Sequence, residues 1–288
     1  MAEQQPVPEQ PQREFCPSLA FCTPVRYVKT PDGGTRLNPI THEWHRARMK
    51  IQSPCGYNMA ELEIDGREIG VARCLAVEQA RKQGSKFIFF LDDDVIAPHN
   101  ILKILTQHAD NRPDYDIFGG FYVIKEFPPS VMLWKEWGSG NYWDWTLGDV
   151  LDDLCGIATG CMLIRLSLFD RLEQTPEKPW FKTLIESGET PDGSPMTHCM
   201  TDDIYFCKRA IEEAHAKILV DTNCYCRHID NNTGKVWGLP DDCIPVNRLA
   251  EKLEKMKTEK IVVGPPWYTP LMQVAFRLGR KSVLEPKP

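Results

Sequence analysis

Three consecutive carboxylates follow an apolar run in this chain. Residues 87–91 are all apolar, and they lead directly into Asp92, Asp93 and Asp94. Adjacent carboxylates repel one another, and placing them at the end of a buried strand costs stability unless a cation balances their charge. Carboxylate oxygens suit Mg²⁺ and Mn²⁺, which usually bind through one or two carboxylates together with substrate phosphates. The triplet therefore predicts a site for a divalent cation and a phosphate group, and a solvated acidic turn is the simpler alternative.

Two further acids and a histidine are candidates for the same site. Asp202 and Asp203 stand at the start of a segment with helical periodicity, residues 202–214. The dipole at a helix N-terminus stabilises carboxylates, so capping is an alternative to catalysis for this pair. His228 follows an expected strand and turn, and it joins the site only if the fold brings it to the triplet.

The cysteines indicate a reducing compartment. The chain has 11 of them, an odd number, and they are scattered along its length. The N-terminus lacks a basic region followed by an apolar one, so we expect no secretory signal. Reduced thiols in the cytoplasm are the better interpretation. Cys224, Cys226 and His228 lack the second spaced cysteine pair of most structural zinc sites, so no zinc module is expected.

Composition narrows the class of protein. The chain has 288 residues, of which 42% are hydrophobic and 26% charged, as in ordinary soluble globular proteins. Its formal net charge of -6 argues against broad binding to nucleic acid or anionic lipid. No apolar run approaches the roughly 20 residues that span a bilayer.

Strand and helix patterns alternate in the first half of the chain. We expect strands at 18–22, 87–91, 116–123, 157–164 and 217–221, and helices at 42–49, 67–83, 98–107, 166–172 and 202–214. Two long loops, rich in aromatic residues, are expected at 127–149 and 173–200. This alternation predicts an α/β fold with a mostly parallel central sheet flanked by helices. Ligands bind such sheets beyond the carboxyl ends of the strands, where the aspartate triplet is expected.

The order of these motifs resembles the GT-A class of nucleotide-sugar glycosyltransferases and is similar to its family-2-like branch. A first strand ending in Thr-Pro is followed by a helix containing Arg73 and then by FLDDDV. GIATGCMLIR, TDDIYFCKRA and a late histidine complete the order. The resemblance spans roughly residues 18–228. It implies a GT-A (Rossmann-like) sheet with long loops on the acceptor side.

The resemblance also implies a metal site. By position, Asp92 and Asp94 hold the metal and the donor diphosphate, and Asp94 is favoured as the direct ligand. Because three acids stand in a row, the alignment is ambiguous and Asp93 could take one of these places. His228 matches a later metal ligand of the family. The implied cofactor is Mn²⁺ or Mg²⁺, which neutralises charge on the departing diphosphate.

Donor contacts follow from the same resemblance. Thr23 and Pro24 match the wall that holds the nucleoside, and Arg73 matches a basic residue that approaches the donor. Gly160 matches a position where the backbone passes close to the donor sugar, which is a physical reason for glycine. The implied donor is a nucleotide sugar, with a UDP-sugar favoured.

The catalytic base and the acceptor are less closely defined. Asp203 aligns with the base of inverting members, and Asp202 stands where those members usually have glutamate, so inversion is favoured over retention. The acceptor is a polysaccharide, a lipid, a protein or a modified DNA base. Trp143 and Trp180 are the candidate acceptor contacts, because tryptophan stacks on sugar rings, although it also caps hydrophobic cores.

Two other functions stay open. A nucleotidyltransferase acting on sugar phosphates uses a similar sheet, but its Gly-rich, Lys-containing phosphate loop is missing after the first strand. A non-catalytic carbohydrate-binding relative is the other alternative, and the presence of all the candidate acids and His228 disfavours it.

The expected domains are a disordered lead-in at 1–16, a glycosyltransferase domain at 17–240 and a helical tail at 241–288. The lead-in is polar and rich in proline and glutamine. The tail holds a charged amphipathic helix at 247–257 and an apolar stretch, 264–283, that contains basic residues. We favour packing of this stretch on the domain or on a second copy of the chain over a peripheral membrane contact.

Overall fold

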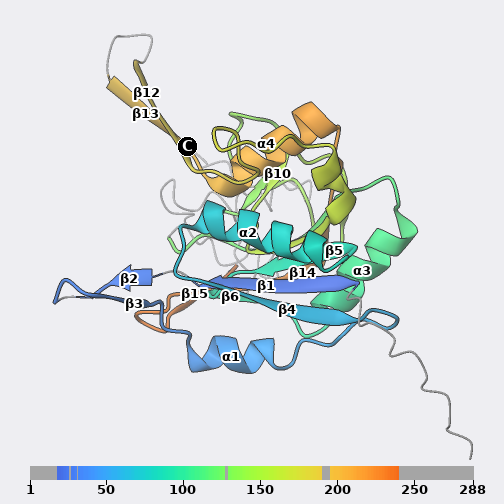
Figure 1. Cartoon of the computed structure of the whole chain (residues 1–288), viewed down its shortest axis with the longest axis horizontal. Helices are drawn as coiled ribbons and strands as arrows, with labels where there is room; N and C mark the ends of the chain where they lie inside the picture. Colours follow the sequence, from blue (N-terminus) through green and yellow to red (C-terminus); the bar gives the residue numbers. More distant parts are fainter. Residues whose placement is uncertain (1–17, 26, 31, 127–128, 190–194, 240–288) are drawn as a thin grey trace, which may run out of the picture.

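A seven-stranded sheet forms the centre of the molecule, in the order β4-β1-β5-β11-β7-β14-β9. The computed structural model describes residues 18–25, 27–30, 32–126, 129–189 and 195–239 (Figure 1). The expected lead-in and the expected C-terminal tail lie outside these ranges. The sheet strands are β4 (Met59–Asp65), β1 (Leu19–Val25), β5 (Phe87–Leu91), β11 (Cys161–Arg165), β7 (Ile117–Phe121), β14 (Ile218–Tyr225) and β9 (Val150–Leu151).

Most strands of this sheet point the same way. β1 is parallel to β4 and β5, and β14 is parallel to β7. β11 is antiparallel to both of its neighbours, β5 and β7, and β9 is antiparallel to β14. The predicted α/β fold with a mostly parallel sheet is therefore confirmed, with β11 and β9 as the reversed strands.

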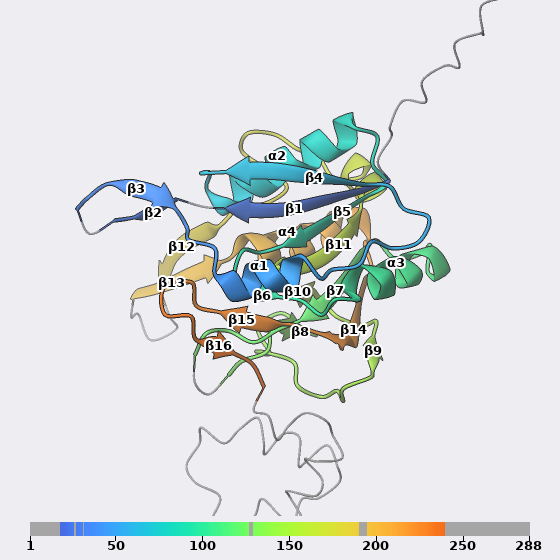
Figure 2. The ribbon, with the colours of Figure 1, turned by 90° about the horizontal axis from the view of Figure 1, so that it is seen from below.

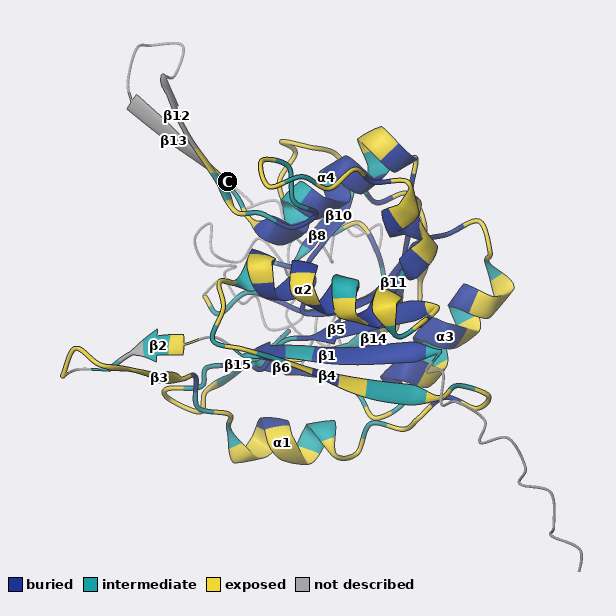
Figure 3. Ribbon diagram, viewed as in Figure 1, coloured by how far each residue is buried: buried dark blue, intermediate teal, exposed yellow. Residues whose placement is uncertain are grey.

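Helices cover both faces of the sheet (Figures 1 and 2). One face carries α2 (Ile69–Lys82) and α4 (Asp202–Ala214), and the other carries α1 (His42–Arg48) and α3 (Ile101–Asn111). Alternate residues of β5 serve the two layers, with Ile88 and Phe90 in the first core and Phe89 in the second. A strand covered on both faces needs an unbroken apolar run, which β5 has, and Figure 3 shows it buried.

Capping residues mark the start of α2 and the ends of α2 and α4. The Glu68 side chain accepts a hydrogen bond of 3.0 Å from the Val71 N–H at the start of α2. Gly84, with φ +73°, follows the last turn of that helix, and His215 takes a left-handed conformation after α4. The helices predicted at 67–83 and 202–214 match these two elements within about two residues.

Several local predictions were wrong. The segment predicted as a loop at 173–200 contains the hairpin of β12 (Leu184–Glu189) and β13 (Pro195–Met200). The strand predicted at 157–164 is divided between β10 (Gly156–Ile157) and β11, and the helix predicted at 166–172 is the 3₁₀ helix η1 (Leu166–Asp170). The edge strand β4 was not predicted at all.

Short strands outside the main sheet complete the described chain. β2 (Tyr27–Lys29) pairs with β3 (Thr35–Leu37), and this hairpin and the β12–β13 hairpin extend away from the sheet (Figures 1 and 2). A three-stranded ribbon is formed by β16 (Val236–Trp237), β15 (Arg227–Ile229) and β6 (Val95–Ile96), and β10 pairs with β8 (Leu133–Trp134). Within the described ranges, no helix has the length and apolar character needed to cross a membrane.

Candidate active site

The direction of each aspartate in the triplet follows from the alternation of side chains along β5. Ile88 and Phe90 face the layer of α2 and α4, and Asp92 continues on that side. Asp93 takes the opposite side, where its carboxylate accepts a hydrogen bond of 2.8 Å from Asn38 Nδ2. The structure thus separates the Asp93 carboxylate from that of Asp92.

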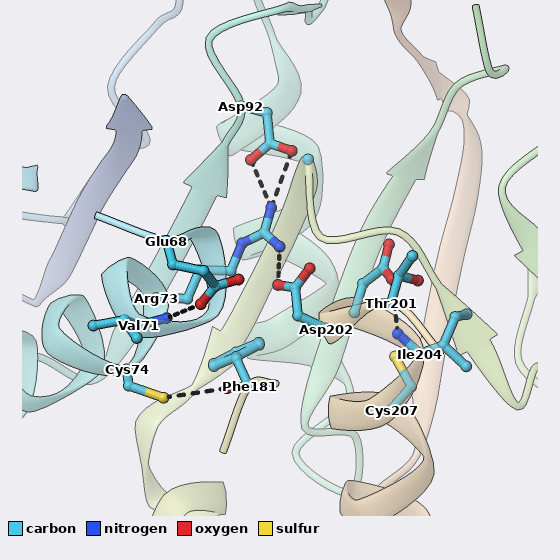
Figure 4. A network of polar contacts seen from close by, with 12 residues as sticks. Glu68, Val71, Arg73, Cys74, Asp92, Phe181, Thr201, Asp202, Ile204 and Cys207 are labelled. Carbon is cyan, nitrogen blue, oxygen red and sulfur yellow. Dashed lines mark hydrogen bonds and ion pairs between the residues drawn. The ribbon is translucent and has the colours of Figure 1, made fainter. Parts of the chain in front are cut away.

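Arg73 of α2 lies between Asp92 and the first turn of α4 (Figure 4). Its Nη2 donates to both carboxylate oxygens of Asp92, at 2.8 and 3.0 Å, and its Nη1 donates to Asp202. Only 4% of the Arg73 side chain is exposed, so these ion pairs are formed largely out of water. Three predicted site residues, from α2, from α4 and from the turn after β5, are therefore joined through the guanidinium group of Arg73.

The charges in this cluster do not balance. Burial opposes the charge of Arg73, yet Asp92, Asp202 and Asp203 together hold its pKa above the ordinary value. Burial raises the pKa of Asp92, and Arg73 offsets this only in part. Burial and the charge of Asp202 also raise the pKa of Asp203. One guanidinium faces three carboxylates, and this excess of acid favours a bound cation.

Asp203 keeps one carboxylate oxygen available. Its Oδ1 accepts a hydrogen bond from the Thr201 hydroxyl and another, of 2.8 Å, from the Ile204 N–H. No hydrogen bond within the described part of the chain reaches its Oδ2. Asp202, by contrast, is engaged with Arg73. A buried carboxylate with a raised pKa and a free oxygen is suited to accept a proton.

Asp94 belongs to a second group of charges. Its carboxylate lies 2.5 Å from Lys125 Nζ and 3.3 Å from His228 Nε2. Burial alone would raise the pKa of Asp94, but the hydrogen bond and charge of His228 together with Lys125 lower it to about 2. The structure therefore brings together Asp94 and His228, which are far apart in the sequence.

The Asp94–His228 pair fits a divalent cation chemically. His228 Nδ1 lies 3.0 Å from the carbonyl oxygen of Val123, which can only accept a hydrogen bond, so Nδ1 carries the proton. With Nδ1–H directed at Val123, Nε2 faces Asp94 Oδ1 at 3.3 Å. A proton or a metal ion can bridge these two atoms.

The two aspartates predicted as metal ligands have different partners. Asp92 is paired with Arg73, whereas Asp94 pairs with His228 and Lys125. Within the ranges that the structure describes, no three or more His, Cys, Asp and Glu side chains already form a metal-binding group. Asp94 and His228 are thus the better candidate ligands.

Gly160 lies against the aspartate triplet. Its carbonyl oxygen accepts a hydrogen bond of 3.1 Å from the Asp92 N–H, and its own N–H donates to Tyr122 Oη at 3.2 Å. A Cβ atom at this position would lie 3.0 Å from Asp92 Oδ2 and would clash with the Tyr122 hydroxyl. Glycine is needed here because the backbone passes between two site side chains.

Two residues of the site, Tyr122 and Lys125, were missed from the sequence. Both follow β7, which is parallel to β5, so they lie at the same edge of the sheet as the triplet. Burial raises the pKa of Tyr122 well above its ordinary value, and the charges of Asp92 and Asp203 add to this effect. The position after a neighbouring parallel strand is the signal that could have identified them.

Polar atoms without partners also gather at this edge. Thr23 and Pro24, the residues predicted to hold the nucleoside, lie near the end of β1. Among the described residues, the buried atoms Thr23 Oγ1, Arg73 Nε and Thr159 Oγ1 have no hydrogen-bond partner. Buried polar atoms are nearly always satisfied, so these three atoms are available to hydrogen-bond a polar ligand or water.

The two tryptophans predicted to contact an acceptor both pack in or against the hydrophobic core. Trp180 is 3% exposed and belongs to the hydrophobic core, where its Nε1 donates to the Leu172 carbonyl at 3.1 Å. Trp143 is stacked on the buried Trp145, with ring centroids 6.3 Å apart. Packing accounts for both positions, and neither lends support to the acceptor role.

Trp137 is better placed to contact an acceptor than Trp143 or Trp180. Its side chain is among the exposed large hydrophobics, at 39% exposure. A Cβ atom built on Gly156 would lie about 3.1 Å from the Trp137 ring and 3.4 Å from Ile204 Cδ1. The ring therefore lies near Ile204 in the first turn of α4. Ile204 directly follows Asp203 in the sequence. Nothing in its local sequence distinguished it from the other tryptophans of the same loop.

Comparisons with known proteins do not identify the function of this chain. No protein-family model matches the sequence, and no curated protein matches it. Among solved structures, the chain is similar to A197 from STIV, with a TM-score of 0.47 and 13% identity over 77% of this chain and 94% of that one. It is also similar to S. aureus TarS 1-349, with a TM-score of 0.39 and 12% identity over 93% of this chain and 72% of that one. The complex of TarS 1-349 with UDP-GlcNAc gives the same TM-score, at 13% identity over 93% of this chain and 73% of that one. Likenesses of this strength do not assign an activity.

Proposed function

We propose that this chain is a glycosyltransferase that moves a sugar from a nucleoside-diphosphate donor to a hydroxyl acceptor. The observation that carries the proposal is that two groups of charges lie at the carboxyl edge of a mostly parallel sheet. Arg73 is buried between Asp92 and Asp202 next to Asp203, and His228 pairs with Asp94. Sheets of this kind bind ligands at that edge. The order of motifs in the sequence supports the same activity and favours a UDP-sugar.

In this proposal Asp94 and His228 hold a divalent cation, Mn²⁺ or Mg²⁺. The cation, when bound, neutralises the charge that builds on the departing diphosphate. Lys125, which pairs with Asp94, adds a positive charge at the same place. The Nδ1–H contact with Val123 keeps the His228 ring oriented, so that Nε2 faces Asp94 and could bind the ion.

Arg73 and the orphaned hydroxyls are proposed to bind the donor. The guanidinium is fixed from two sides by Asp92 and Asp202, so it is already oriented before the donor arrives. Thr23 Oγ1 and Thr159 Oγ1 can each form a hydrogen bond with a donor hydroxyl or phosphate oxygen. Gly160 lets the backbone pass between Asp92 and Tyr122, because a side chain there would meet both.

Asp203 is the proposed base, and inversion at the sugar is the favoured outcome. The acceptor hydroxyl gives its proton to Asp203 Oδ2 as the hydroxyl oxygen forms a bond to the anomeric carbon of the donor sugar. The bond from that carbon to the diphosphate oxygen breaks, and the diphosphate leaves with the electron pair. Asp202 orients Arg73 and does not take the proton, because its carboxylate is already engaged.

A donor panel tests this proposal. The protein is incubated with UDP-sugars, with and without Mn²⁺, and the products are separated by chromatography. We expect free UDP to be released, by transfer or by slow hydrolysis, only when the metal is present. Release of pyrophosphate would instead indicate a nucleotidyltransferase, and sugar binding without metal-dependent nucleotide binding would indicate a non-catalytic relative.

An Asp94→Asn variant provides the matched test of the residue assignment. We expect it to lose metal-dependent UDP binding in calorimetry, together with turnover. Asp114→Asn is the control, since Asp114 is exposed and pairs with Lys217 outside the site. Wild-type sugar transfer by the Asp94→Asn variant would refute the proposed site.

A further inference from the structure

A concave site away from the candidate active site is lined by residues of α1, β6 and β15. These three elements lie close together in the fold (Figures 1 and 2). This pocket has a volume of about 440 Å³. Its charged and titratable lining comes from His42, Glu43, Arg46 and Lys50 on and after α1, from His99 and from Arg227 on β15. The proposed glycosyl transfer uses none of these side chains.

The pocket faces away from the candidate active site. In β15, Arg227 pairs with Ile96 and His228 with Val95, so the two β15 side chains point to opposite faces of the ribbon. His228 contacts Asp94 and the Val123 carbonyl on one face. Arg227 reaches Glu43 of α1 on the other face, at 3.7 Å. A ligand in the pocket would therefore bind behind the metal-ligand candidates and not among them.

The pocket carries an excess of positive charge in an acidic protein. Arg46, Lys50 and Arg227 contribute three cationic side chains, and Glu43 is the one carboxylate in the lining. Glu43 is already within ion-pair distance of Arg227, whereas Arg46 and Lys50 form no ion pair within the described residues. The chain as a whole has a formal net charge of -6, so this local concentration of cations is not a consequence of overall composition.

The floor of the pocket is apolar. Ile96 and Ala97 are each 6% exposed, and the basic side chains around them are exposed and form the rim. A phosphate ion alone would occupy a small part of such a volume, which is in the range of small-molecule sites. Arginine and lysine side chains at a rim recognise phosphate oxygens, and a buried apolar floor accommodates the organic group that carries them.

We propose that this pocket binds a small organic phosphate. Its phosphate group contacts Arg46, Lys50 and Arg227, and its organic part lies on Ile96 and Ala97. The proposal does not depend on the glycosyltransferase activity, because no residue of the pocket belongs to the candidate active site.

Calorimetric titration of the full-length protein with ribose 5-phosphate tests this assignment, with ribose and inorganic phosphate as comparison probes. We expect ribose 5-phosphate to bind more tightly than inorganic phosphate, and ribose without phosphate to give no signal. Arg46→Glu and Lys50→Glu should each weaken the binding of ribose 5-phosphate by about tenfold or more, since each reverses a charge at the rim. Lys103→Glu on α3 and Arg67→Glu before α2 are matched exposed controls, expected to bind like the wild type.

Two further measurements separate this proposal from others. Asp94→Asn should leave ribose 5-phosphate binding unchanged, because the proposed pocket is on the other face of the ribbon. Equal weakening in the control variants, wild-type affinity in Arg46→Glu and Lys50→Glu, or absence of binding at millimolar ribose 5-phosphate would each overturn the assignment. Binding to vesicles containing phosphatidylglycerol without binding to ribose 5-phosphate would also overturn it and would indicate a membrane contact instead.

Discussion

Replacing Arg73 with glutamine would remove the buried cation that Asp92 and Asp202 share. The side chains of Arg73 and Asp202 are 4% and 9% exposed, and that of Asp92 is 23% exposed. Removing one partner of a buried ion pair leaves an uncompensated charge and costs about 3 to 5 kcal/mol. Because Asp92 keeps some contact with water, we expect the lower end of this range, about 3 kcal/mol at neutral pH. That is a large fraction of the stability of an ordinary domain.

The matched control lies on the same helix. Arg81 also forms an ion pair, with Asp170, but these side chains are 40% and 62% exposed. Exposed pairs contribute about 0 to 1 kcal/mol, so Arg81→Gln should change the free energy of unfolding much less than Arg73→Gln. Urea denaturation followed by circular dichroism measures both variants against the wild type.

The pH dependence of Arg73→Gln identifies the cause of its instability. Burial raises the pKa of Asp92 and Arg73 lowers it, so without the guanidinium this pKa lies further above its unfolded value. The folded variant then binds protons more tightly than the unfolded chain, so its stability falls as the pH rises through the folded pKa. The deficit relative to wild type should therefore shrink as the pH is lowered toward about 4, and Asp202→Asn should recover part of it. A deficit that equals that of Arg81→Gln, or that does not change with pH, would refute this reasoning.

Three other substitutions test the site in different ways. Asp203→Asn should lower the turnover number by about a hundredfold or more, and in the wild type the acidic limb of the pH profile should lie above the usual aspartate range, since the pKa of Asp203 is raised. Unchanged turnover in this variant would remove Asp203 as the base. Gly160→Ala should cost about 1 to 3 kcal/mol in the free energy of unfolding, and Tyr122→Phe should relieve part of that cost by removing the hydroxyl that the new Cβ meets. Equal costs in both backgrounds would contradict the steric explanation. Trp137→Ala should raise the KM for the acceptor with little effect on UDP binding or stability, whereas Trp145→Ala should destabilise the fold. An unchanged acceptor KM would exclude Trp137 as a contact.

Local periodicity was sufficient for the elements that carry the acids. The predicted strand at 87–91 and the predicted helix at 202–214 match β5 and α4 in their bounds. β5 is buried on both faces, so it reads as an unbroken apolar run, and α4 has an amphipathic pattern that begins at its acidic first turn. β4 was missed because it is a half-exposed edge strand in which Glu61 and Glu63 interrupt the apolar positions.

The burial of individual aromatic residues was harder to predict from the sequence. Trp137, Trp143 and Trp180 have the same chemistry and lie in similar polar loops. Trp180 nevertheless packs in the core, and Trp137 is exposed beside α4. The difference depends on which distant strands and helices approach each loop, and a local pattern contains no information about that.

The sequence by itself determined the α/β class, the position of the acids after a buried strand and the identity of most residues around them. Only the tertiary structure decided their partners. Arg73 and Asp202 are 129 positions apart, and they meet because α2 and α4 cover the same face of the sheet. Side-chain alternation along β5 sends Asp92 to that face and Asp93 to the other, while the register of β15 against β6 places His228 beside Asp94. Ion pairs depend on distance in space, and in this chain the strand order sets those distances.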